Sequence, residues 1–168
     1  MMDIVDVALP LGLGITLAAT AGLRAFLPLM LVSALGYTGA VDLSGPVAFL
    51  AHPAAVLTFT IGVLLEVAAD KVPFIDHMVD TIGTVIRPLA GALVGTSLVV
   101  GTEPLITAVM GMAAGGTIAG VTHLGKATTR MGSTATTGGA GSPVLSTIED
   151  VIAVGVGGTA ALLAAGAL

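Results

Sequence analysis

The sequence predicts an all-α membrane protein, a polytopic helical bundle, and three observations lead to that prediction. Of the 168 residues, 55% are hydrophobic and only 9% are charged, with a mean hydropathy of +1.09, whereas a soluble domain carries about 25% charged residues. The apolar residues form long blocks, each near the ~20 residues that cross hydrocarbon as a helix. The 24 glycines favour close helix packing. We therefore expect residues 1–168 to form a single integral membrane domain of about five spans.

Composition also limits the function classes. Cysteine is absent, which excludes disulfides, thiolate metal sites and cysteine nucleophiles. The net charge of −5 rules out a basic nucleic-acid footprint, and the chain lacks the G-x-S-x-G, H-E-x-x-H and P-loop motifs. We expect no enzymatic activity, no cofactor and no nucleic-acid partner. Asp3 and Asp6 replace the basic start of a signal peptide, so the first block is expected to be retained.

The first apolar block covers residues 9–36 and is interrupted at Gly22, Arg24 and Pro28. Proline removes a backbone donor and clashes with the preceding turn, so the block predicts a kinked or discontinuous first helix. The second block, Val47 to Ala69, has His52 and Pro53 near its start. It predicts a second span.

The middle of the chain predicts an amphipathic helix and then a third span. Residues 73–85 place apolar side chains at helical spacing, with Asp76, His77 and Asp80 on the other side. We expect this helix to lie at the interface or to fold back into the protein. Arg87 and Pro88 open the apolar stretch of about 86–101, which is expected to span.

Two more spans are predicted at residues 104–125 and 144–168, joined by a Gly/Ser/Thr-rich stretch that resembles a mobile linker. With the N-terminus cytoplasmic, every loop that carries lysine or arginine falls on the cytoplasmic side, as the positive-inside rule requires. These loops hold Lys71, Arg87, Lys126 and Arg130. The prediction is a multi-pass protein of the inner (plasma) membrane with its C-terminus outside.

A faint internal repeat relates residues 9–70 to residues 104–168. "TAGLRAFLPL" resembles "IAGVTHLGKA", and "LLEV" aligns with "TIED", which places Glu66 opposite Glu149. Three intervening spans would make the repeat inverted, as in many transporters. Chance similarity between helices rich in alanine and glycine explains the matches equally well.

Charged residues inside apolar blocks are functional candidates, because each costs about 2.5 to 3.5 kcal/mol on insertion scales and usually faces the protein interior. Arg24 lies midway along the first block, so we expect it to be a buried partner of carboxylates or an anion contact. Glu66 and Asp70 share one helical face, and Lys71 neutralises part of their charge. The alternative is that Asp70 and Lys71 merely mark the end of the second span.

The remaining candidates are also open to structural interpretations. Asp76 and Asp80 have the same i, i+4 spacing and would suit a hard cation better than zinc, although a solvated helix face explains them as well, and no metal site is predicted. His123 would relay protons, line a pore or simply pack through hydrogen bonds. Glu149 and Asp150 lie in the first turns of the last span, where acidic groups also stabilise the helix end.

Four segments carry a family resemblance: "AGLRAFLPL", "LEVAADKVPFIDHMVDTIGTVIRPLAGAL", "THLGKATTR" and "SPVLSTIEDVIAVG". In this order, over nearly the whole chain, they resemble the bacterial membrane family catalogued as domain of unknown function 4126. The resemblance implies a multi-pass membrane protein and carries no activity. It marks these positions: Arg24, Glu66, Asp70, Lys71, Asp76, Asp80, Arg87, Pro88, His123, Lys126, Glu149 and Asp150.

The charge pattern favours a small transporter or channel for an inorganic ion or small solute. Its ion pathway is predicted to use these residues: Arg24, Glu66, Asp70, Lys71, Asp76, Asp80, Arg87, His123, Glu149 and Asp150. Since five spans are few for enclosing a pathway, we expect a homo-oligomer, a dimer in the first instance, joined through small-residue faces such as "GMAAGGTIAG". The alternative is a non-transporting scaffold that binds lipid or a partner protein.

Overall fold

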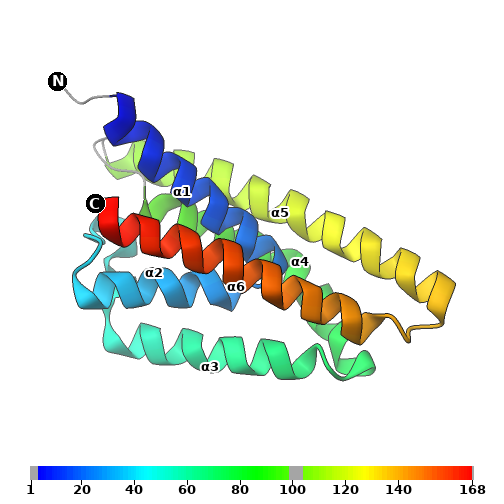
Figure 1. Ribbon diagram of the computed structural model, residues 1–168. Coiled ribbons are helices and arrows are strands. Elements are labelled where there is room, and N and C mark those ends of the chain that lie inside the picture. Colours follow the sequence, from blue (N-terminus) through cyan, green and yellow to red (C-terminus); the bar gives the residue numbers. More distant parts are fainter. Residues whose placement is uncertain (1–3, 99–103, 168) are drawn as a thin grey trace.

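The computed structural model describes residues 4–98 and 104–167, and within these ranges every secondary-structure element is a helix. The elements in chain order are α1 (Ile4–Leu23), α2 (Phe26–Thr38), the 3-10 helix η1 (Gly45–Ala51), α3 (Pro53–Ala69), α4 (Pro73–Ser97), α5 (Pro104–Thr137) and α6 (Ser142–Ala167). The helices form one elongated bundle (Figure 1). The predicted all-helical class is confirmed.

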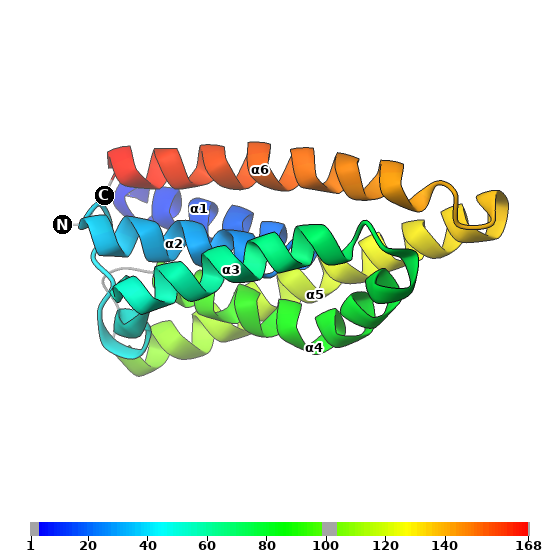
Figure 2. The ribbon, with the colours of Figure 1, turned by 90° about the horizontal axis from the view of Figure 1, so that it is seen from below.

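The first apolar block is broken, and its two pieces form a hairpin. α1 ends at Leu23 and α2 begins at Phe26, so the predicted break lies at Arg24 and Ala25. Pro28 fits in the first turn of α2, where its missing N–H has no helical acceptor to lose. α1 runs into the bundle and α2 returns toward the end where α1 began (Figures 1 and 2). The block therefore does not cross from one end of the bundle to the other, which differs from the predicted broken span.

Fewer than five helices pass a length and apolarity criterion for crossing a membrane. Two helical segments of the described chain pass it, Met78–Ser97 and Ser142–Gly166, and η1 with α3 would make a third as one bent span. The start of α1 and the end of α6 lie at the same end of the bundle (Figures 1 and 2), whereas the prediction placed the termini on opposite sides. Arg87, Lys126 and Arg130 are buried in helices and do not lie in loops, so the positive-inside rule, which counts loop charges, does not apply to them.

The second apolar block is bent at its start. η1 and α3 meet at an angle of 73° around His52, since a residue that precedes proline is disfavoured in the helical conformation. The His52 ring caps α3 by accepting a hydrogen bond from the Ala54 amide at 3.1 Å. α3 then runs to Ala69 and ends next to Asp70.

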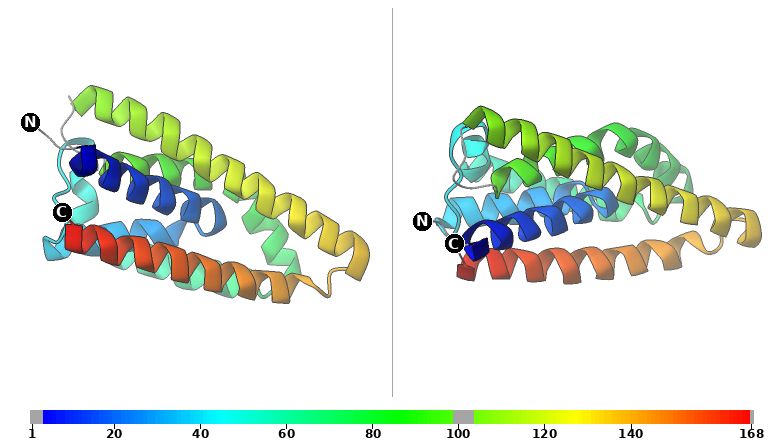
Figure 3. Two further views of the ribbon diagram at one scale, coloured as in Figure 1. Left: turned by 45° about the horizontal axis from the view of Figure 1, so that its top comes forward. Right: turned by 90° about the horizontal axis from the view of Figure 1, so that it is seen from above.

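Two boundaries in the second half differ from the prediction. α4 is one helix from Pro73 to Ser97 that continues through Pro88, where we expected an interfacial helix followed by a separate span. α5 continues through the supposed linker to Thr137 and extends well beyond the tip of α1 (Figure 3). Thr128, Thr129 and other hydroxyl side chains there bond back to carbonyls one turn earlier, which satisfies their polar groups within the helix.

Small residues allow α4 and α5 to pack backbone against backbone. We call this contact the glycine seam, formed by Gly91, Gly95, Gly111 and Gly115. A Cβ atom on Gly115 would meet the Gly91 carbonyl carbon at 3.0 Å and the Gly95 Cα at 3.1 Å, so only glycine permits this approach. The "GMAAGGTIAG" stretch, predicted to join two copies of the chain, uses this face within one copy.

Candidate functional site

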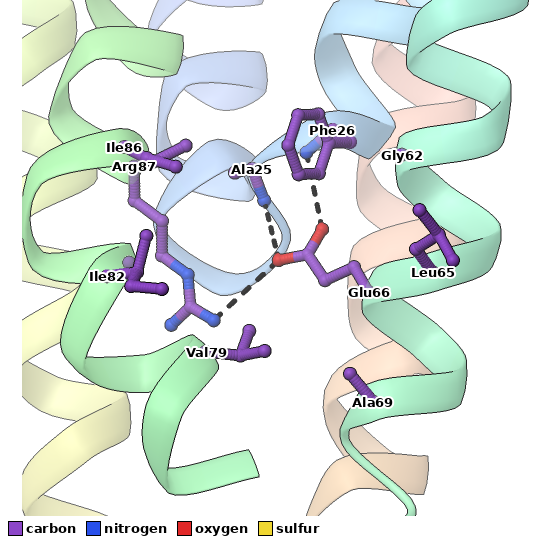
Figure 4. Close-up of a pocket in the computed structure, with 11 residues that line it drawn as sticks. Ala25, Phe26, Gly62, Leu65, Glu66, Ala69, Val79, Ile82, Ile86 and Arg87 are labelled. Atoms are coloured by element: carbon purple, nitrogen blue, oxygen red, sulfur yellow. Dashed lines mark hydrogen bonds and ion pairs between the residues drawn. The ribbon is translucent and has the colours of Figure 1, made fainter. Parts of the chain in front are cut away.

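The tip of the α1–α2 hairpin is held by a carboxylate from α3. Glu66 is 5% exposed, and its two oxygens accept the backbone N–H groups of Ala25 at 3.1 Å and Phe26 at 3.3 Å. These amides form the N-terminus of α2, where free N–H groups and the helix dipole favour an anion. The Arg87 guanidinium lies 3.7 Å from the same carboxylate (Figure 4). A side chain at Glu66 therefore fixes where the hairpin turns.

Arg24 occupies the break itself and is 2% exposed. Its guanidinium pairs with Asp70 at 2.5 Å and also with Asp150. The same group donates to the Ser146 hydroxyl at 3.2 Å. Arg24 thus joins the hairpin to α6 and to the residue that ends α3.

A second group of contacts lies on the side of α5. Arg130 pairs with Glu149 at 2.8 Å, with Asp70 at 3.3 Å and with Asp80 at 3.5 Å. Lys126 lies 3.2 Å from Glu149 and 3.4 Å from Asp80. Because the two basic side chains share these three carboxylates, α4, α5 and α6 are tied together near the end of α3.

The two groups join into one ion-pair network. Its members are Arg24, Lys71, Arg87, Lys126, Arg130, Glu66, Asp70, Asp80, Glu149 and Asp150. All five basic residues of the chain belong to it, with five of the ten acidic residues. The formal charges therefore cancel, and every buried charge has an opposite partner. Such pairing offsets the cost of removing ions from water, which otherwise is several kcal/mol for each ion.

His123 extends the network as a neutral acceptor. Arg87 Nη1 lies 2.6 Å from His123 Nδ1, and an arginine nitrogen can only donate. Nδ1 therefore accepts, and the ring proton is on Nε2, which lies 3.3 Å from the Thr84 hydroxyl. That hydroxyl in turn donates to the Asp80 carbonyl at 3.3 Å, which leaves its oxygen free to accept from Nε2. The contacts fix both the charge and the tautomer of the ring.

Several buried polar atoms of the network keep unused bonding capacity. Arg24 Nε, Arg87 Nε and Asp70 Oδ1 have no hydrogen-bond partner within the described part of the chain. The side chains of Arg87 and Asp70 are 0% exposed. Since buried polar groups are ordinarily satisfied, these atoms can bind water or a small solute without breaking an existing hydrogen bond.

Three cavities reach the network from different directions. The α3–α4 cavity, of about 240 Å³, is lined mainly by apolar side chains with Glu66 and Arg87 at its inner wall (Figure 4). The α3–α6 cavity, of about 260 Å³, is lined by Arg24, Glu66 and Asp150 among apolar residues of α2, α3 and α6. The end cavity, of about 660 Å³, lies between α4, α5 and the start of α6 and contains hydroxyl and charged side chains. Asp80, Thr84, His123 and Arg130 line it.

The structure brings most of the predicted pathway residues into this network. Asp76 lies on α4, but its side chain is outside the described part of the chain. Asp80, proposed with Asp76 as a hard-cation site, pairs with Arg87, Lys126 and Arg130. No group of three or more potential metal-binding side chains was found among the described residues.

Sequence reasoning missed four contributors to the site. Lys126 and Arg130 follow His123 at helical spacing, but they were placed in a cytoplasmic loop and left out of the predicted pathway. Ser146 contacts both Arg24 and Lys71. The backbone amides at the hairpin tip leave no sequence signal beyond the break itself.

Comparison with known proteins identifies the chain by its family alone. No curated protein and no solved structure matches it. A family model, the domain of unknown function DUF4126, matches residues 11–167. The chain therefore belongs to the DUF4126 family.

Proposed function

We propose that this protein is a small transporter or channel that carries an inorganic ion or a small solute across the inner membrane of a bacterium. The observation that carries the proposal is the hairpin whose tip lies within the bundle at a buried, charge-balanced network. Broken helices with a free N-terminus at the bilayer midplane are how many transporters form their sites. Irregular backbone at that depth is tolerated where it lines a cavity or is buried in protein, as the break at Arg24 is.

In this proposal α3, α4, α5 and α6 cross the bilayer, and the α1–α2 hairpin enters and leaves through one face. The exposed leucine, isoleucine and valine side chains of α3 and α6 would face lipid, including Leu64, Leu65, Val151 and Leu162. The cavities beside α3 and at the end of the bundle would supply routes to the network. Glu66 and Glu149, which the faint internal repeat aligns, both lie in it.

The test is transport by the purified protein in liposomes. Ion or solute flux is expected to collapse in Glu66→Gln and Glu149→Gln, because each change removes a charge from the network while it keeps the shape of the side chain. Asp42→Asn is the matched control, since Asp42 is exposed and forms none of the ion pairs of the network. Wild-type flux that persists in both glutamine variants would contradict the proposed pathway.

A second candidate function is a non-transporting scaffold that binds lipid or a partner protein. The observation in its favour is that the network is fully charge-balanced, as expected for ion pairs whose role is to hold the helices together. On this alternative, liposomes show no flux, and the two glutamine variants lower thermal stability or oligomerisation. We propose transport as the first candidate because a purely structural ion-pair network does not require the three cavities that reach it.

We further propose a homodimer, because so short a chain encloses little space by itself. Neither a catalytic activity nor a cofactor nor a nucleic-acid partner is proposed. Chemical cross-linking in native membranes tests the dimer, with a covalent species of twice the monomer mass as the expected result. A single monomer band at every cross-linker concentration would contradict it.

A further inference from the structure

His123 lines the end cavity and contacts Arg87, which lines the α3–α4 cavity. His123 and Asp80 line the end cavity, and Arg87 lines the α3–α4 cavity with Glu66. The 2.6 Å contact between Arg87 and His123 thus joins the walls of the two cavities. Arg87 therefore has partners that line each cavity, with His123 and Asp80 in the end cavity and Glu66 in the α3–α4 cavity.

A proton and Arg87 compete for one lone pair. His123 Nδ1 accepts from Arg87, and its Nε2 already carries the ring proton that points to Thr84. A second proton can bind only at Nδ1 and converts the ring into an imidazolium, which has no acceptor left for the guanidinium. Protonation of His123 must therefore separate it from Arg87.

The Arg87 guanidinium has alternative partners when it leaves His123. Its Nη2 lies 3.7 Å from Glu66 and 3.1 Å from Asp80, and its Nε has no hydrogen-bond partner among the described residues. The long Glu66 contact can shorten into a direct hydrogen bond. Glu66 is also the carboxylate that holds the amides of the hairpin tip. A change at His123 is thereby transmitted to the break between α1 and α2.

The charged groups around His123 include some that stabilise its protonated ring and some that destabilise it. Asp80 and Arg87 face the ring from α4, and Lys126 lies one turn further along α5. α1 presents backbone at Gly22, which packs against the His123 amide, and among the described side chains of α1 none that is ionisable contacts the ring. Burial disfavours the imidazolium most, Arg87 and Lys126 also disfavour it, and Asp80 favours it, so one of the opposing contributions falls when Arg87 moves away.

We propose that the proton is the ion handled by this site, that His123 binds it, and that the end cavity is its aqueous entrance. Arg87 moves from Nδ1 onto Glu66 and Asp80, and a hydronium ion in the end cavity then gives its proton to the vacated lone pair of Nδ1 and leaves water. The inference rests on the proposed transport function and names its ion. A proton needs only one acceptor lone pair, which His123 Nδ1 supplies, whereas a metal cation needs several ligands, and the described residues contain no group of three or more potential metal-binding side chains.

Two measurements test this inference separately from the transport function. The first is ¹⁵N NMR of histidine-labelled protein in nanodiscs, titrated between about pH 5 and pH 8. We expect the His123 ring to have the Nε2–H tautomer at the alkaline end and to become doubly protonated on acidification. The signal is assigned by its loss in His123→Asn. A ring that is charged throughout, or that has the Nδ1–H tautomer, would overturn the inference.

The second measurement is proton flux into vesicles of phosphatidylcholine and phosphatidylglycerol that contain a pH-sensitive dye. On the alkaline side of the His123 titration, wild-type flux is expected to rise about tenfold for each pH unit of acidification, because the protonated fraction changes by that factor. His123→Asn should lose this dependence while it stays folded, since the asparagine oxygen replaces Nδ1 as the acceptor for Arg87. His52→Asn is the matched control, because it preserves the equivalent acceptor for the Ala54 amide.

The outcomes distinguish the two proposals. Flux in the wild type with an unchanged pH profile in His123→Asn would overturn the role of His123 and leave transport standing. Absence of flux under every gradient would overturn both the transport function and the proton as its ion. The NMR titration would then still decide whether His123 exchanges Arg87 for a proton.

Discussion

Helices α4 and α5 are joined differently in the two halves of their contact. In the half near the α4–α5 connection, the glycine seam brings the backbones together through Gly91, Gly95, Gly111 and Gly115, and charged side chains are absent from that seam. In the other half, Asp80 and Arg87 of α4 face Lys126 and Arg130 of α5. The same pair of helices is thus packed tightly at one end and connected through polar groups at the other.

The difference teaches where the molecule can change shape. Backbone contacts without intervening side chains have few alternative arrangements, so the glycine seam is expected to stay fixed. In the ion-pair network, several basic side chains share the same carboxylates. Cavities and unused hydrogen-bonding atoms lie next to them, so these side chains can exchange partners. We therefore expect motion at the ion-pair network and α1–α2 hairpin, with the glycine seam as the static support.

The largest effect is expected from Asp70→Asn. Asp70 is 0% exposed at its side chain and pairs with Arg24, Arg130 and Lys126. Removing one partner of a buried ion pair costs about 3–5 kcal/mol because the opposite charge is left uncompensated. The free energy of unfolding, measured by chemical denaturation in detergent micelles, should fall by that amount. The double variant Asp70→Asn with Arg24→Gln should lose less than the sum of its single changes, and strict additivity would refute the coupling.

A smaller but still clear loss is expected from Gly115→Leu in the glycine seam. The new side chain has no space against Gly91 and Gly95, and overpacking of this kind costs about 1–3 kcal/mol. Thermal unfolding followed by circular dichroism should show a lowered midpoint. Gly155→Leu serves as the control, because Gly155 is exposed and a Cβ there meets nothing within 4 Å. Equal midpoints for the two variants would argue against a tight seam.

The smallest effect is expected from Lys71→Met at the edge of the ion-pair network. Lys71 is 41% exposed at its side chain and pairs with Asp150 at 3.0 Å. Exposed ion pairs contribute about 0.2–1 kcal/mol, and salt screens them. The loss in unfolding free energy should therefore shrink as salt is added. A loss as large as that of Asp70→Asn, insensitive to salt, would move Lys71 into the buried part of the network.

Local sequence features were enough to predict the helical class and the position of the break. An arginine flanked by glycine and proline within an apolar block indicates both an interruption and a buried charge, and Arg24 shows both. The i, i+4 pair Glu66 and Asp70 is also buried. In each case the signal lies within a few residues of the feature that it predicts.

The features that the sequence did not predict depend on contacts between distant residues. The hairpin reverses where Glu66 binds amides 40 and 41 positions earlier, and nothing near Ala25 indicates that partner. Arg130 was placed in a linker because threonine, serine and glycine are typical of loops, whereas ion pairs to α4 and α6 accompany the helical extension of α5. The small residues at Gly111 and Gly115 predict a close contact, but a single sequence cannot tell whether the partner is α4 or a second copy.

The order in which the helices are synthesised gives the charge balance of the ion-pair network a consequence for biogenesis. Arg24 leaves the ribosome 42 positions ahead of Glu66 and 122 positions ahead of Ser146. A nascent chain that stops before α6 lacks Glu149 and Asp150, so its five basic side chains face three of the five network carboxylates. Arg24 therefore lacks its α6 partners Ser146 and Asp150 until the last helix has been synthesised, and only that helix completes the neutralisation of the network.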